Sequence, residues 1–312
     1  MNSNTGLYEI ARSVNPQAIH LMNQYLNQVM RTRGGRVGSG MGTVLETLWG
    51  YHLNLAMTEA GFSEFEIAWF PDHQYHDFAC VRSNSDWDPF SKNGEFFRIE
   101  AKSMIFGDAD EPKAHFDVLR HELEIDDAIL LIVWNWERVD SYHVSPRIRD
   151  CYFDRATPIA FLRDELHKAR GGMFVDRFHC PDHCPPSICP HHGEPLNADG
   201  KRERKGGPIN TRVSAKTSHA QNFGGMLRML TPSGLQATLT LRQLRKSDPT
   251  INNFVDFIYR NFPKEELNHY NLSEWQAAAS TFGLDVNAPK QRLQENLLRI
   301  TNGSYRSYLA NL

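Results

Sequence analysis

Two segments near the start of the chain carry apolar residues at helical spacing. The first lies within residues 16–33, and a stretch rich in glycine and arginine follows at 33–42. This pattern predicts an amphipathic helix that ends in a loop. The apolar positions of this helix are Ile19, Leu21, Met22, Tyr25, Leu26, Val29 and Met30.

The second helix is predicted from Thr43 to Ala60. Its apolar positions are Val44, Leu48, Tyr51 and Leu55. Thr43 fits the N-cap, Glu46 is the third residue after it, and Gly61 fits the end of the helix. Glu46 is therefore expected in the first turn.

After Gly61 the period of the pattern changes from that of a helix to that of strands. Residues 65–70, 75–81 and 95–104 are rich in aromatic and β-branched residues. Proline, glycine and other turn residues separate the three segments. The pattern predicts three successive strands of one antiparallel meander.

Helical spacing returns from Lys113 to Leu123, and residues 128–136 form a continuous apolar run. Such a run is typical of a strand that is covered on both faces. From Thr43 the expected order is helix, three strands, helix and strand. The fold class that follows is α/β, of the α+β type, with a central mixed sheet flanked by helices.

The remainder of the chain is predicted to be mainly helical around one segment of different composition. A strand is expected at 141–152 and a helix at 158–170, and cysteine, histidine and proline dominate after Phe178. Further helices are expected at 251–262, 273–282 and 289–300. Residues 178–200 therefore look like a small inserted module.

Composition narrows the class of protein only slightly. The 312 residues carry 34 basic and 37 acidic side chains, a net charge of −3, so any contact with nucleic acid depends on local patches. The longest apolar run, Ala128–Trp134, is far shorter than the roughly 18 residues that a membrane span needs. The first residues lack a basic segment and an apolar core, which indicates no secretory signal and an intracellular protein.

The strand at 95–104 contains the strongest candidate for chemistry. Because side chains alternate along a strand, Arg98, Glu100 and Lys102 share one face, and the apolar Phe97, Ile99 and Ala101 share the other. Asp77 opens the preceding strand and can reach the charged face across the ladder. A carboxylate and an ammonium held on one stiff face can bind a divalent metal and steady a water or phosphate oxygen.

This arrangement resembles the PD-(D/E)XK nuclease superfamily, and within it the type II restriction endonucleases. Asp77, Glu100 and Lys102 match its acidic and lysine positions, and residues 43–137 match its order of elements. The resemblance implies a restriction-endonuclease-like core and phosphodiester hydrolysis. It also implies that Asp77, Glu100 and the Ala101 carbonyl hold Mg²⁺, and that Lys102 orients the attacking water and stabilises the transition state.

The sequence allows alternatives for two acidic residues of this site and for the Glu100–Lys102 pair. Asp72 follows a proline, as the first acid of the family often does, whereas Asp77 starts an apolar strand and is preferred. Glu46 matches a further acid that many members carry on the preceding helix, where it binds a second metal or orients water. The alternative for Glu46 is an ordinary capping glutamate. For Glu100 and Lys102 the alternative is a surface ion pair.

The inserted module carries the residues expected of a structural Zn²⁺ site. The preferred ligands are Cys180, Cys184, Cys189 and His192, because residues 189–196 resemble a zinc-ribbon knuckle with histidine in place of its second cysteine. His183 and His191 are alternative ligands. Buried free thiols would need apolar partners that the segment lacks. Stapling of a small loop is the simplest role for the metal.

Two basic clusters are candidates for contacts with DNA phosphates. The first cluster follows the module and has six basic residues and one acidic residue. The alternative interpretation of this cluster is a solvated linker. The second cluster lies among glycines just before Glu46. The first comprises Lys201, Arg202, Arg204, Lys205, Arg212 and Lys216. The second comprises Arg31, Arg33 and Arg36.

Four regions follow from these features. Residues 1–42 form an N-terminal helix and an arginine- and glycine-rich loop, and 43–177 the nuclease-like core. Residues 178–200 form the zinc module, and 201–312 a basic connector with a helical C-terminal region.

The expected function is site-specific, Mg²⁺-dependent cleavage of double-stranded DNA, as the resemblance to type II restriction enzymes implies. It places the protein in the cytoplasm of a prokaryotic cell. A homodimer or dimer of dimers on a near-palindromic site is expected, since one catalytic centre cuts one strand. Phe254, Phe257, Ile258, Leu293, Leu297 and Leu298 could line its interface or pack within the subunit. The alternatives are a repair or recombination nuclease of the same superfamily and a non-enzymatic zinc-containing DNA-binding regulator.

Overall fold

The computed structural model describes residues 3–34, 40–70, 76–91, 93–107, 114–176, 191–200, 223–231 and 234–312. The chain forms two compact units. Unit 1 contains Met1–Ala114 and Glu122–Thr157, and unit 2 contains His115–His121 and Pro158–Leu312. Among the described residues, no helix is long and apolar enough to cross a membrane.

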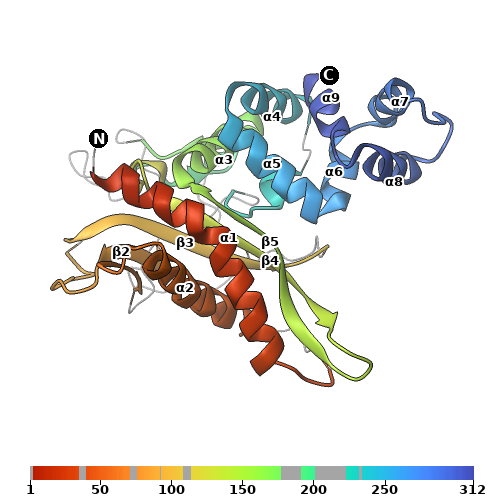
Figure 1. Cartoon of the computed structure of the whole chain (residues 1–312). Coiled ribbons are helices and arrows are strands. Elements are labelled where there is room, and N and C mark those ends of the chain that lie inside the picture. Colours follow the sequence, from red (N-terminus) through yellow and green to blue (C-terminus); the bar gives the residue numbers. More distant parts are fainter. Residues whose placement is uncertain are drawn as a thin grey trace. The chain divides into compact units, whose positions relative to one another are not determined.

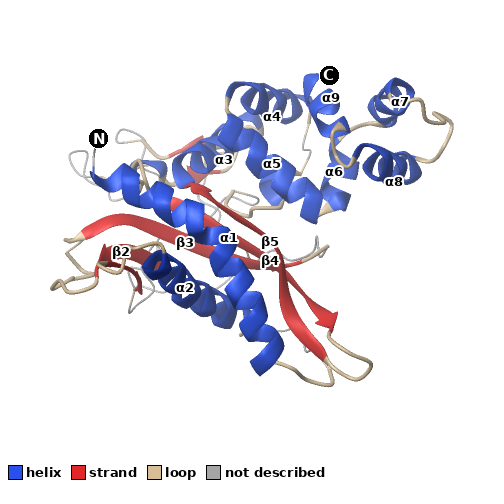
Figure 2. Cartoon of the chain, viewed as in Figure 1, coloured by secondary structure: helices blue, strands red, loops and turns tan. Residues whose placement is uncertain are grey.

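Unit 1 is built on a curled, mixed sheet of five strands in the order β1-β2-β3-β4-β5 (Figure 2). The strands are β1 (Phe65–Trp69), β2 (Phe78–Arg82), β3 (Glu95–Ile105), β4 (Ala128–Arg138) and β5 (Val144–Arg155). β1, β2 and β3 form an antiparallel meander, β4 runs parallel to β3, and β5 returns antiparallel to β4. The predicted meander and mixed sheet are confirmed.

Helices α1 (Ser3–Val29) and α2 (Met41–Glu59) cover one face of this sheet (Figure 1). Trp49 of α2 packs with Ile99 and Ala101 of β3 in the same buried cluster, and its indole N–H donates to the Asn15 side chain of α1 at 2.8 Å. The apolar face predicted for β3 is therefore the face that the helices cover. β4 is buried from Ala128 through Trp134, as its continuous apolar run predicts.

The helix predicted from Lys113 to Leu123 is wrong. Over residues 114–119 the chain is irregular, and only a short 3-10 turn, η1 (Arg120–Glu122), follows. Phe116 and Val118 are buried with the less buried Asp117 between them, which is the period of extended chain. The Phe116 N–H donates to the Gly224 carbonyl at 2.7 Å, so a distant segment supplies the partner that a helix would have supplied internally.

The described residues of unit 2 are mainly helical and include a small two-stranded ribbon. Its helices are α3 (Ala156–Ala169), α4 (Leu235–Ser247), α5 (Pro249–Asn261), α6 (Pro263–His269), α7 (Leu272–Thr281), α8 (Lys290–Thr301) and α9 (Tyr305–Asn311). The ribbon pairs β6 (Met173–Phe174) with β7 (Pro195–Leu196), and the turn η3 (Arg228–Leu230) precedes α4. The helices predicted at 251–262, 273–282 and 289–300 correspond to α5, α7 and α8, whereas α4, α6 and α9 were not predicted.

The apolar side chains proposed for a dimer interface pack inside unit 2. Phe254, Phe257, Ile258, Leu293 and Leu297 are at most 1% exposed, and of that set Leu298 alone is exposed. In the same unit, the buried Glu266 carboxylate accepts hydrogen bonds from Arg306 and from the Tyr305 hydroxyl. Packing within the subunit, the alternative to an interface, accounts for these five residues.

Candidate active site

The candidate site lies where β2 begins and where β3 continues beyond its pairing with β2. Phe78 pairs with Ile99, and the Asp77 N–H donates to the Ile99 carbonyl at 3.0 Å. From Ala101 to Ile105, β3 pairs with β4 on its other edge. At this point the Asp77 carboxylate accepts a hydrogen bond from the Ala101 N–H at 2.8 Å. The Asp77 side chain thus takes the place of the next backbone hydrogen-bond partner of β3. Beyond Ile99, this edge of β3 is therefore lined by side chains rather than by β2.

Lys102 connects the acidic residues at this edge. Its ammonium lies 2.6 Å from Glu100 Oε1 and 3.4 Å from Asp77 Oδ2. It also donates to the Ala101 carbonyl at 2.9 Å. Burial opposes the charge on Lys102, but the carboxylates of Glu100, Asp77 and Glu46 outweigh it, so the pKa of Lys102 is raised. The ammonium therefore stays protonated at neutral pH.

Glu46 reaches the same site from α2. Burial raises the pKa of its carboxyl group to about 7, the Lys102 ammonium opposes this rise, and the Asp77 carboxylate adds to it. Hydrogen bonds from Ser103 of β3 favour the charged form. At neutral pH the Glu46 carboxyl group is therefore close to half protonated.

The capping interpretation of Glu46 is wrong. α2 begins at Met41, two residues before Thr43, and its N-cap, Gly40, makes no side-chain capping bond. Glu46 therefore lies beyond the position of a capping glutamate, and its carboxyl group interacts with Ser103 of β3.

Gly42 and Ser103 complete this contact, and the sequence analysis did not identify either residue. A Cβ atom on Gly42 would lie 2.5 Å from Ser103 Oγ, which is closer than real contacts allow. Glycine at this position lets the first turn of α2 approach β3. The only signal in the sequence is the serine directly after Glu-Ala-Lys in the strand.

A buried ion pair borders the site on the same strand. Asp127 is fully buried and accepts hydrogen bonds from the Arg98 backbone at 2.9 Å and from its guanidinium at 2.7 Å. His76, the residue before Asp77, is 4% exposed, with Nε2 4.0 Å from Asp127 Oδ2. This pair ties β3 to the chain at the start of β4 and fixes the strand that carries Glu100 and Lys102.

The chemistry of the site fits a hard divalent cation. Glu46, Asp77 and Glu100 supply carboxylate oxygens, and Lys102 balances only part of their charge. Oxygen ligands of this kind are those that Mg²⁺ prefers. Among the residues that the structure describes, no three His, Cys, Asp or Glu side chains already form a group that could hold a metal ion. The Lys102 ammonium is the cation that contacts both Asp77 and Glu100 here.

Several predicted site residues lie outside the described part of the chain. They are Arg36, Asp72, Cys180, His183, Cys184, Cys189, Lys201, Arg202, Arg204, Lys205, Arg212 and Lys216. Of the remainder, Arg31 forms an ion pair with Asp140, and Arg33 is exposed. His192 lies just before β7, with its ring centroid 5.8 Å from that of His121.

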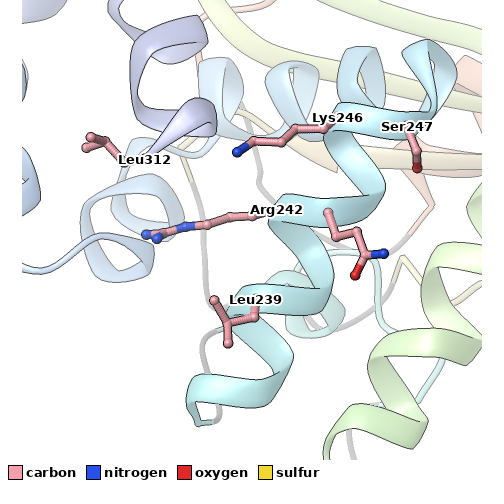
Figure 3. A pocket seen from close by; sticks show the side chains of 6 residues that line it. Leu239, Arg242, Lys246, Ser247 and Leu312 are labelled. Atoms are coloured by element: carbon pink, nitrogen blue, oxygen red, sulfur yellow. The ribbon is translucent and has the colours of Figure 1, made fainter.

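Glu46, Asp77, Glu100 and Lys102 line neither of two open pockets among the described residues. In unit 1, a pocket of about 400 Å³ is lined by the C-terminal half of α1 and by the β4–β5 hairpin, including Asn23 and Arg147. In unit 2, a pocket of about 420 Å³ lies along α4, where Arg242 and Lys246 extend toward Leu312 (Figure 3). No Asp or Glu side chain lines the second pocket.

Comparisons with known proteins identify no relative of this chain. No protein-family model matches it, and neither a curated protein nor a solved structure does. The functional argument therefore rests on the residues and their geometry.

Proposed function

We propose that the protein is a Mg²⁺-dependent endonuclease of the PD-(D/E)XK type that cuts double-stranded DNA at a specific sequence, as type II restriction enzymes do. The observation that carries the proposal is the meeting of Asp77, Glu100 and Lys102 at the point where β2 leaves β3. A structural ion pair alone would need one carboxylate beside Lys102. Here the carboxylates of Asp77 and Glu100 both contact the Lys102 ammonium, and the Glu46 carboxylate also raises the pKa of Lys102. The negative charge of the carboxylates therefore exceeds the positive charge of the lysine, which suits a metal cation.

Each residue has a defined task in the proposed hydrolysis. Asp77, Glu100 and the Ala101 carbonyl would hold Mg²⁺, which supplies polarisation of the scissile phosphate and a lowered pKa of water. Lys102, protonated at neutral pH, stabilises the negative charge that develops on the phosphate oxygens. Glu46, with a pKa of about 7, can accept a proton from the attacking water near neutral pH.

The proposed reaction on double-stranded DNA also suggests how subunits assemble on the substrate. A single centre hydrolyses one strand, so we propose that two subunits act on a near-palindromic site. The basic residues at 201–216 and around Arg33 are the proposed phosphate contacts. A structural Zn²⁺ in the 178–200 module is a separate part of the proposal, which rests on the density of cysteine and histidine there.

Cleavage of supercoiled plasmid DNA tests the nuclease. The wild type should give defined bands with Mg²⁺ and none with EDTA. Glu100→Gln and Lys102→Ala should abolish cleavage while circular dichroism and thermal unfolding remain close to those of the wild type. Glu64→Gln is the matched control, because this carboxylate is 65% exposed and pairs with Arg82 away from the site.

Three outcomes would redirect the proposal. Cleavage by Glu100→Gln at the wild-type rate would remove the assignment of the site. Cleavage restricted to branched, damaged or terminal substrates would favour a repair or recombination nuclease. Sequence-specific binding without cleavage, equal in Mg²⁺ and in EDTA, would identify a DNA-binding regulator.

A further inference from the structure

A polar pocket in unit 1 takes no part in the proposed hydrolysis. It has a volume of about 400 Å³ and lies between the C-terminal half of α1 and the β4–β5 hairpin. One wall is a polar face of α1, whose residues are spaced so that they lie on the same side of the helix. They are His20, Asn23, Gln24 and Asn27. Three of these four side chains end in a carboxamide, a group that both donates and accepts hydrogen bonds.

Hydrogen bonds fix the two walls of the pocket relative to each other. The Asn23 amide N–H donates to the Ile148 carbonyl at 3.0 Å, and the Asn23 side-chain oxygen accepts from the Ile148 N–H at 2.8 Å. After the helix, Thr32 and Val144 exchange two backbone hydrogen bonds, at 3.0 and 2.8 Å. The side chains of the pocket are thus carried on elements with a fixed separation, which a specific binding site requires.

The remaining polar side chains of the lining combine donors with acceptors. Gln24 and Asn27 are exposed and present their carboxamides to solvent. The hairpin adds two arginines, Arg138 and Arg147, and one carboxylate, Glu137, which lies 3.5 Å from the Arg147 guanidinium. A site for phosphates needs positive charge, and a carboxylate beside it would repel them. The mixture of carboxamide, guanidinium and carboxylate instead matches the edges of DNA bases, which present both donors and acceptors.

The pocket belongs to the same unit as the candidate active site. Strand β4 connects the two, because Leu131 pairs with Lys102 and Glu137 lies six residues further along the strand. At about 3.3 Å per residue, this separation is about 20 Å along β4. Roughly six base pairs of a duplex, at about 3.4 Å each, span the same length. A short DNA site can therefore reach from the catalytic residues to the pocket.

We propose that this pocket reads base edges of the DNA substrate in the major groove, with Gln24, Asn27 and Arg147 as its specificity-determining residues. The inference rests on the proposed function and adds to it the residues that select the sequence. Asparagine and glutamine bind adenine through two hydrogen bonds, and arginine binds guanine in the same way. The Glu137 carboxylate positions the Arg147 guanidinium for this contact. Contacts to phosphates elsewhere place the duplex, whereas contacts to bases select it.

Selection from a pool of randomised duplexes tests the inference without requiring cleavage. The full-length protein is incubated with the pool in Ca²⁺ in place of Mg²⁺, and the bound duplexes are sequenced. The wild type should enrich one sequence. Gln24→Ala, Asn27→Ala and Arg147→Lys should each relax the selection at one or two positions and bind the preferred duplex about 5- to 150-fold more weakly. Their affinity for duplexes of other sequence should stay close to that of the wild type, because contacts to phosphates remain.

Two features of these variants exclude a merely structural effect. Arg147→Lys keeps the positive charge and removes only the fork of donors that pairs with guanine. Gln28→Ala is the matched control, because this exposed amide follows Asn27 directly on α1 but does not line the pocket. It should enrich the same sequence as the wild type, with the same affinity. Thermal unfolding of all four variants should match that of the wild type.

The outcomes separate this inference from the proposed nuclease. If the three pocket variants enrich the wild-type sequence with wild-type affinity, the pocket does not read bases and the nuclease proposal stands. Equal weakening toward every duplex would assign the residues to phosphate contacts and overturn the inference. If the wild type enriches no sequence, the inference and the sequence specificity of the proposed function are both wrong. Plasmid cleavage by the wild type and by Glu100→Gln decides the nuclease independently.

Discussion

The Asp77 carboxylate accepts a hydrogen bond from the Ala101 N–H at 2.8 Å, at the point where β2 no longer pairs with β3. The same oxygen lies 3.4 Å from the Lys102 ammonium. One side chain therefore completes the edge of the sheet and contributes charge to the candidate site. These two tasks can be separated experimentally, because a neutral amide preserves the shape of the side chain and removes its charge.

We expect Asp77→Asn to reduce cleavage by at least about 100-fold, since the charge acts on the metal and the transition state. The loss of unfolding free energy should be small, about 1 kcal/mol, because the amide oxygen can still accept from Ala101. Single-turnover cleavage and urea unfolding measure the two effects. Asp72→Asn is the control and should remain active. If Asp72→Asn is inactive and Asp77→Asn is active, Asp72 is the metal ligand and the family proposal survives.

The pKa of Glu46 predicts how stability depends on pH in the absence of metal. The pKa is raised from 4.5 to about 7 in the folded protein, so between these values the folded state binds more protons than the unfolded state. Stability should therefore fall as pH rises through this window. The shift corresponds to about 3 kcal/mol, which is lost by pH 8.

Glu46→Gln removes this titration and tests its sign. In urea unfolding with EDTA, the wild type should lose about 3 kcal/mol relative to Glu46→Gln between pH 4.5 and pH 8. Glu64→Gln, at an exposed carboxylate, should follow the wild type. Parallel pH profiles for the wild type and Glu46→Gln would show that the carboxyl group titrates normally.

The buried pair of Arg98 and Asp127 predicts a large effect on stability. Asp127→Ala should lower the unfolding free energy by about 3–5 kcal/mol, because it removes the fully buried carboxylate that pairs with the buried Arg98 guanidinium. Glu124→Ala is a matched control, since Glu124 lies 3.5 Å from the same guanidinium but its side chain is 73% exposed. It should cost no more than about 1 kcal/mol. Equal losses in the two variants would contradict the importance of burial.

Light scattering with and without cognate DNA tests the expected assembly. We expect a homodimer or a dimer of dimers on DNA. Because Phe257 is buried within unit 2, Phe257→Ala should reduce the unfolding free energy by about 3–5 kcal/mol rather than dissociate the assembly. Leu298→Ala, at an exposed position, should have a small effect on stability. A monomer in both states that nicks one strand would favour the repair-nuclease alternative.

Local patterns in the sequence determined the strands of unit 1 and the charged face of β3. The alternation of Phe97, Ile99 and Ala101 with charged residues has the period of a strand, and the structure buries those three against the helices. The continuous run from Ala128 likewise identified a strand that is buried on both faces. Such patterns could be read directly because the period of burial is a local property of the backbone.

The tertiary structure decided which distant residues meet. Glu46 lies near Lys102 and Ser103 because α2 begins at Met41 and because Gly42 permits a close approach to β3. Phe116 is extended rather than helical because Gly224 supplies its hydrogen-bond partner. His121 lies beside His192 because both segments fold into unit 2. The periodicity of apolar residues indicates which side of an element is buried. Which other element covers that side depends on how whole elements pack, and therefore on contacts between residues far apart in the chain.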